Sequence, residues 1–80
     1  MTQLRNKLLL QKVAVVLKQL RDNTGLIQDD VYDQTKIHIA RIETAGVNLS
    51  ISTLASLCEY YNISLVDFFK RVEKLDLKKK

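Results

Sequence analysis

The sequence contains no proline, only two glycines and a single cysteine among its 80 residues. Because strand-like alternation of apolar and polar residues is also hard to find, this composition predicts an all-helical domain. One cysteine cannot form an internal disulfide, which fits a reducing cytoplasm. The length suits one small domain that spans residues 1–80.

Long apolar runs are missing as well. The longest are Leu8–Leu10 and Val13–Leu17, which are too short to cross a bilayer. Lys12 interrupts the apolar stretch near the N-terminus, so this stretch does not have the pattern of a signal peptide. We therefore expect a cytoplasmic protein with no membrane partner.

The sequence also lacks the groupings of residues that catalysis, metal binding and cofactor binding require. Its one histidine, His38, and its one cysteine, Cys58, are too few for a usual metal site. The acids at positions 29, 30 and 33 do not belong to a calcium loop with oxygen ligands at alternate places. No glycine-rich phosphate loop or nucleophile elbow is present. These absences predict a protein that is not an enzyme, with no cofactor, metal or evident small-molecule ligand, in which Cys58 is a buried apolar side chain.

Basic charge is concentrated at the two ends of the chain. Residues 1–21 carry five basic side chains and no acid, residues 22–69 carry two against seven acids, and residues 70–80 carry six against two. The net charge of +4 favours nucleic acid as a partner. Since phosphate neutralisation supplies most of the affinity for DNA, it would have to come from the termini, from helix N-termini or from a dimer.

The first helix is predicted over about Gln3–Asp22 from its apolar spacing. Val13, Leu17 and Leu20 recur at i, i+4 and i+7, as in a stripe that faces a core, and the apolar residues at 9 and 16 can join them. Further apolar residues fall outside the stripe. They predict either a surface for a partner or N-terminal turns that fold back on the last helix.

Two further helices are predicted after residue 50. Ser52 is expected to cap the first of them, Thr53–Tyr61, and Ser64 to cap the second, from Leu65 to about residue 75. With the two short helices described next, these elements predict a single core formed by Val13, Leu17, Leu20, Val31, Ile39, Ile42, Leu54, Leu57, Ile63 and Phe68.

Residues 28–43 predict two short helices joined by a tight turn. Gly25 is suited to the left-handed end of the first helix of the chain. A helix over residues 28–34 then opens with acids in its first turn, as the helix dipole favours. Thr35 is expected to cap a following helix that starts at Lys36. Two such helices with an open N-terminal end on the second form a helix-turn-helix unit.

Several short pieces of sequence surround and include this unit in a fixed order. They are Leu17…Leu20-Arg21, Gly25-Leu26-x-Gln28, Arg41-Ile42-Glu43, Ser52-x-Leu54 and Asn62-Ile63-Ser64-Leu65. This ordered set, over roughly residues 13 to 70, resembles the Cro/phage-repressor (XRE-type) helix-turn-helix family. The step from Gln28 to Glu43 is about three residues shorter than is usual in that family, and its turn lacks a glycine.

The resemblance implies an all-α, compact five-helix bundle of the phage-repressor DNA-binding-domain type. It also implies that Arg21 and Glu43 form a partly buried ion pair between the first helix and the recognition helix. The alternative from the residues alone is two solvated charges. The side chains expected to face DNA are Gln28, Thr35, Lys36, Ile37, His38 and Arg41.

Two functional hypotheses follow. In the first, the protein is a sequence-specific regulator of transcription that binds double-stranded DNA with its third helix in the major groove. In the second, a protein-interaction module or antitoxin-like subunit uses the same fold, as the shortened joint favours. We also predict a homodimer through the first and last helices, with an N-terminal extension at 1–12 and a basic tail at 76–80. Its contacts would come from Leu4, Leu8, Leu10, Phe69, Leu75 and Leu77.

Overall fold

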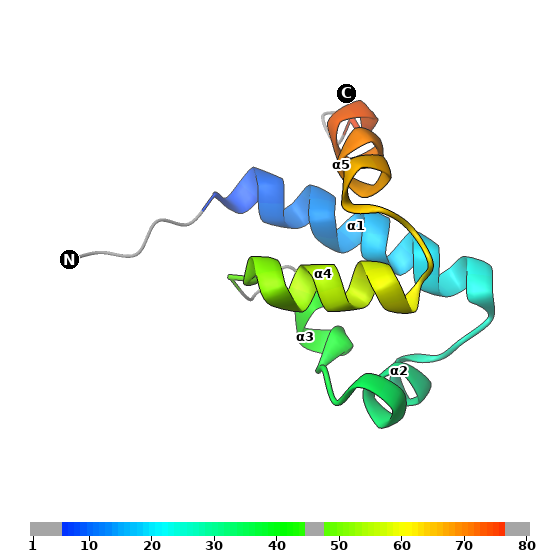
Figure 1. The fold of residues 1–80 in the computed structure, drawn as a ribbon. Helices are drawn as coiled ribbons and strands as arrows, with labels where there is room; N and C mark the ends of the chain where they lie inside the picture. The colour runs from blue at the N-terminus through cyan, green and yellow to red at the C-terminus, as the bar shows by residue number, and fades with distance from the viewer. Residues whose placement is uncertain (1–5, 45–47, 77–80) are drawn as a thin grey trace.

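The computed structural model describes residues 6–44 and 48–76. Within these two ranges the chain forms five α-helices and no strand, so the all-helical prediction is confirmed (Figure 1). In chain order the helices are α1 (Lys7–Thr24), α2 (Gln28–Thr35), α3 (Ile39–Glu43), α4 (Ile51–Tyr60) and α5 (Leu65–Lys74).

Both ends of α1 are fixed by capping. Asn6 adopts an extended backbone and its side chain accepts a hydrogen bond of 3.0 Å from the Leu9 N–H. The helix therefore begins at Lys7, and the predicted start at Gln3 was wrong. At the other end Gly25 has φ 77, and its N–H donates to the Asp22 carbonyl at 3.2 Å. This is the left-handed terminus that a glycine at this position predicts.

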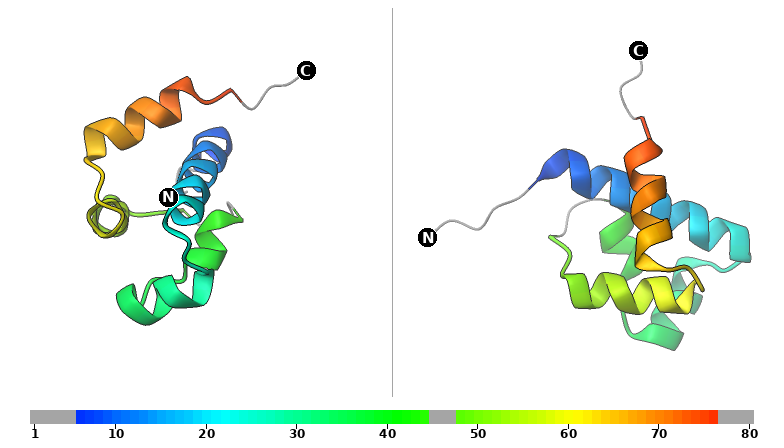
Figure 2. Two further views of the ribbon diagram at one scale, coloured as in Figure 1. Left: turned by 90° about the vertical axis from the view of Figure 1, so that its right-hand side faces the viewer. Right: turned by 45° about the horizontal axis from the view of Figure 1, so that its top comes forward.

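The long helix α1 lies between the other elements. It packs against α3 on one side and α5 on the other, α2 packs against α3, and α4 packs against α5. In the views of Figures 1 and 2, α5 and the α2–α3 pair lie on opposite sides of α1. The helix-turn-helix unit is thus held at one side of the molecule, and α5 covers the other.

The core is formed largely by the predicted residues. Nine of the ten predicted side chains are buried, and Ile63 packs at the edge of the core as a partly buried residue. The core-facing stripe of α1 extends to Val16, as predicted. Leu9 stays 41% exposed, so the prediction that Leu9 joins this stripe was wrong. Cys58 is buried, as predicted, and the remaining buried apolar residues, which the prediction did not include, are Ala14, Tyr61 and Val72.

Serine caps set the start of α4 and α5. The Ser64 side chain accepts from the Asp67 N–H at 3.0 Å, as predicted, and α5 runs from the next residue. The cap of α4 is Ser50, which accepts from the Thr53 N–H at 3.1 Å. The predicted cap, Ser52, was wrong because that residue already lies inside α4. Two serines two residues apart offer two capping registers, and the sequence does not distinguish them.

Candidate nucleic-acid interface

A short joint connects α2 to α3. Thr35 is the last residue of α2, Lys36 adopts a left-handed conformation with φ 62, and His38 occupies the N-cap of α3. The Lys36 N–H donates to the Tyr32 carbonyl at 2.7 Å, which closes the last turn of α2. The predicted start of the third helix at Lys36, with Thr35 as its cap, was therefore wrong.

The hydroxyl of Thr35 explains this difference. It donates to the Val31 carbonyl at 2.7 Å and accepts from the Ile37 N–H at 3.0 Å. The side chain thus holds the end of α2 and the first turn of the joint instead of the start of α3. Threonine makes both kinds of bond in proteins, and its bond to the carbonyl four residues earlier competes with N-capping.

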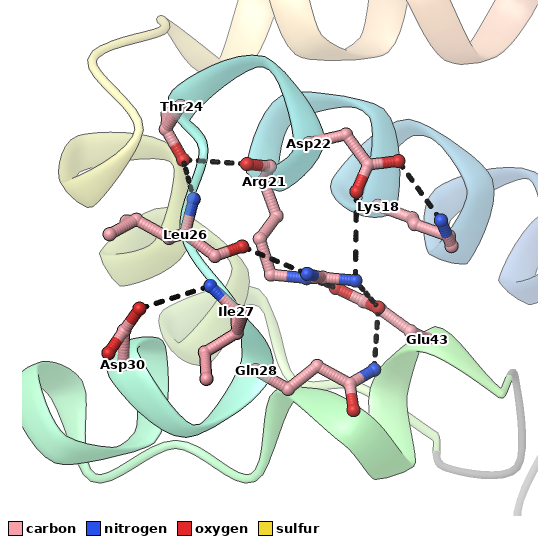
Figure 3. A network of polar contacts seen from close by, with 9 residues as sticks. All are labelled: Lys18, Arg21, Asp22, Thr24, Leu26, Ile27, Gln28, Asp30 and Glu43. Atoms are coloured by element: carbon pink, nitrogen blue, oxygen red, sulfur yellow. Dashed lines mark hydrogen bonds and ion pairs between the residues drawn. The ribbon is translucent and has the colours of Figure 1, made fainter.

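A buried polar network fixes α2 and α3 against α1 (Figure 3). Arg21 donates from Nε to Glu43 Oε2 at 2.7 Å and from Nη2 to Oε1 at 2.9 Å. Its Nη1 also donates to the Leu26 carbonyl at 3.0 Å, so α1, α3 and the loop between α1 and α2 meet at one guanidinium group. The side chains of Arg21 and Glu43 are only 10% and 3% exposed, and the two-bond pair is the geometry expected for arginine and carboxylate.

Electrostatics within this network favour the charged guanidinium group. The hydrogen bond to Glu43 raises the pKa of Arg21 above its ordinary value, while burial acts in the opposite direction. The two side chains thus form the ion pair that the resemblance implies, and they are not solvated charges. Because α1 and α3 carry one partner each, the pair fixes the angle of α3.

Gln28 belongs to the same network. Its side-chain amide donates to Glu43 Oε1 at 2.9 Å (Figure 3). Nearby, the Asp30 carboxylate accepts from the Ile27 N–H at 3.1 Å and secures the first turn of α2. The side chain of Gln28 is therefore directed toward Glu43, and its donor is engaged within the protein.

The six residues predicted to face DNA separate into two groups. Lys36, His38 and Arg41 are exposed at the joint and along α3. Gln28, Thr35 and Ile37 are partly buried, the first two with hydrogen-bonded side chains and Ile37 packed against the core. These three exposed side chains all carry nitrogen donors. They lie beside a hollow of about 300 Å³ that is lined in part by His38, Arg41 and the start of α4.

Tyr32 joins the exposed group, although it is not among the six residues predicted to face DNA. Its ring centroid lies 4.7 Å from that of His38, with 31° between the ring planes. The Lys36 ammonium lies 5.6 Å from the same ring centroid. The i, i+4 spacing of Tyr32 and Lys36 on a helix is the sequence signal that would have found this contact.

Comparison with solved structures identifies a relative. The chain is similar to the restriction-modification controller protein C.Esp1396I, whose crystal structure superimposes with a TM-score of 0.78 and 32% sequence identity. The match covers 90% of this chain and 96% of that protein. The chain belongs to the restriction-modification controller-protein family. No protein-family model matches the sequence, and no curated protein matches it significantly.

This membership confirms the predicted XRE-type resemblance and the five-helix fold. The protein is therefore a helix-turn-helix transcriptional regulator of the DNA-binding class and not an enzyme. Among residues 6–44 and 48–76 no helix is long and apolar enough to span a membrane. In the same ranges no group of three or more His, Cys, Asp or Glu side chains is arranged to hold a metal ion.

Proposed function

We propose that this controller protein selects its DNA sequence with the residues of the α2–α3 joint. Lys36 and His38 would reach base edges in the major groove, and Arg41 would reach a phosphate or a base. The observation that carries the proposal is that these three side chains are all exposed on the α2–α3 pair, which lies on the other side of α1 from α5 (Figure 2). Lysine suits guanine O6 and N7, and a ring N–H of histidine suits a base acceptor.

The partly buried residues of the unit have a supporting role in this proposal. Gln28 and Thr35 hold the network and the joint. Their backbone would lie near the phosphates. Ile37 packs beneath the joint and would bring at most part of its side chain to a thymine methyl group. Substituting these three would lower affinity by disturbing the shape of the unit.

The experiment is selection of bound sequences from a random DNA pool, followed by competition binding with variants. Lys36→Ala or His38→Ala should lower affinity for the selected site and relax its preference at one position, by about 1–3 kcal/mol. Lys18→Ala is the matched control, because the ammonium of Lys18 is already paired with Asp22 at 3.0 Å. Removing Lys78–Lys80, or neutralising Arg5 and Lys7, should instead weaken binding to all sequences and flatten the salt dependence.

Binding that is insensitive to Lys36, Ile37 and His38 together would contradict the proposal for the joint. If the basic ends still mattered in that case, the joint would not read sequence. The protein-interaction hypothesis would then account better for the exposed acids Asp29 and Asp33 on α2.

We further propose that the protein acts as a homodimer through α1 and α5. An apolar groove of about 800 Å³ lies along these helices, and its apolar lining comes from Leu9, Leu65, Val66, Phe69 and Val72. Leu8 and Val66 are 52% and 66% exposed, which is high for large apolar side chains on a single small domain. Of the other predicted contacts, residues 10 and 75 are partly buried, and residues 4 and 77 lie outside the described ranges.

A dimer formed in this way leaves both joints free, because α5 and the α2–α3 pair lie on opposite sides of α1. We expect a palindromic site with half-sites roughly 10 base pairs apart. Val66→Glu should convert the sedimenting species to a monomer. Ile51→Glu, which alters an equally exposed residue on α4, should leave the dimer intact, since Ile51 does not line the groove. A wild-type protein that sediments as a monomer at micromolar concentration would contradict this part of the proposal.

A further inference from the structure

Tyr32 makes contacts with both exposed polar side chains of the joint. Its ring lies against the imidazole of His38 and beneath the ammonium of Lys36, at the distances given above. Its carbonyl also accepts the hydrogen bond from the Lys36 N–H. The residue is 38% exposed, so the fold does not depend on burying its ring.

The joint has little else to hold these two side chains. The His38 side chain makes no hydrogen bond to cap α3, although it occupies the N-cap position. Lys36 has a backbone conformation that side chains rarely adopt, and its turn contains no glycine. A free lysine side chain also loses much rotamer freedom when it binds, which weakens binding unless it is held beforehand.

We propose that Tyr32 is a positioning residue for DNA selection, which acts through His38 and Lys36. Its ring holds the imidazole by stacking and the ammonium by a charge–ring contact, so both groups are pre-arranged before DNA arrives. The inference rests on the proposed role of the joint and adds a residue to it. The ring carries the effect, and the phenolic hydroxyl is not needed.

The test compares Tyr32→Phe with Tyr32→Leu. Both variants keep an apolar side chain at this position, but only phenylalanine keeps a ring. We expect Tyr32→Leu to lower the ratio of affinities for the selected site and for mixed-sequence DNA about 5- to 30-fold, from the loss of both ring contacts. Tyr32→Phe should keep this ratio within about twofold of wild type, because its ring faces are similar.

A mutant cycle separates positioning from direct contact with DNA. In a Lys36→Ala/His38→Ala background, Tyr32→Leu should have no further effect on the ratio, because the groups it positions are gone. An undiminished effect in that background would mean that Tyr32 touches DNA itself, and this would overturn the proposal. A ratio unchanged by Tyr32→Leu in the wild-type background would overturn it as well.

A readout without DNA distinguishes this inference from the proposed function. In NMR spectra, the ε-methylene protons of Lys36 and the ring protons of His38 should show ring-current shifts in wild type and Tyr32→Phe, and lose them in Tyr32→Leu. Absence of these shifts in the wild type would refute the positioning contact itself. If the shifts were present but the wild-type protein selected no sequence, the proposed function would fail and the role of Tyr32 in selection would fail with it. Matching thermal unfolding of the variants would exclude a general loss of structure.

Discussion

Replacing Glu43 with glutamine should remove a large part of the stability of the domain. The substitution keeps the shape of the side chain but leaves the buried guanidinium of Arg21 with only the exposed carboxylate of Asp22, 3.9 Å away, as a counter-charge. The side chain of Arg21 is only 10% exposed, so water replaces little of the lost interaction with Glu43. Breaking a buried ion pair in this way costs about 3–5 kcal/mol. A domain of this size has a free energy of unfolding of roughly 4–12 kcal/mol.

The contrast between single and double substitution tests the reasoning. In Arg21→Met/Glu43→Leu no buried charge is left, and such replacements are often neutral or stabilising. In this double variant the Leu26 carbonyl and the Gln28 amide each lose a hydrogen-bond partner. Each loss lowers the free energy of unfolding by about 1–3 kcal/mol if the group stays buried. We therefore expect the double variant to be more stable than Glu43→Gln, although it lacks more hydrogen bonds.

Urea unfolding followed by circular dichroism measures the differences in free energy of unfolding between these variants. All variants are compared at one protein concentration, because the stability of a dimer depends on concentration. Lys18→Gln is the matched control. It removes an ion pair with Asp22 whose side chains are 56% and 54% exposed. We expect a loss of only about 0.3–0.5 kcal/mol there. If Glu43→Gln cost no more than Lys18→Gln, the network would not hold α3 as argued.

Three further predictions concern stability. Leu17→Ala, at a side chain that is 0% exposed, should cost about 2–5 kcal/mol in urea unfolding, and a loss below about 1 kcal/mol would contradict its place in the core. Gly25→Ala should cost about 1–2 kcal/mol through its φ of 77 alone, since an added Cβ meets no atom within 4 Å, whereas Gly25→Asn should cost less. Burial raises the pKa of Tyr61 from its ordinary 10.0 to about 12, so the folded state holds this proton more tightly than the unfolded state does. The resulting stability is complete below pH 10.0 and is lost as the pH rises toward 12. Unfolding measured across that range should show the loss in wild type and much less of it in Tyr61→Phe.

Features set by local chemistry or by strong periodicity could be predicted from the sequence. The stripe of Val13, Leu17 and Leu20 gave the buried face of α1, because a helix repeats its faces every three to four residues. Gly25 and Ser64 marked helix ends because few other residues meet the backbone requirements there. The ion pair of Arg21 and Glu43 came from the family resemblance, since its partners are 22 residues apart and no local pattern connects them.

The joint between α2 and α3 could not be predicted in the same way. Placing a helix start at Lys36 put Ile37 among the exposed residues, whereas the later start at Ile39 turns Ile37 toward the core. The left-handed conformation of Lys36 is uncommon for lysine and has no signal in the sequence. It is imposed by contacts on both sides, namely the turn closed by Tyr32 and the hydroxyl of Thr35.

The short α3 determines which residues can select DNA in the proposed interface. Its five residues rise only about 7–8 Å, little more than one turn. Such a helix cannot present several turns of side chains to the groove, so in the proposed interface selection would depend on the joint before it. The exposed acids Asp29 and Asp33 on α2 also weaken attraction to phosphates near this surface. Because non-specific affinity comes almost entirely from phosphates, these acids lower it more than they lower base-specific affinity. In the proposed interface, a mildly basic joint beside an acidic helix therefore favours discrimination over tight binding, and two joints in a dimer would supply the affinity that one lacks.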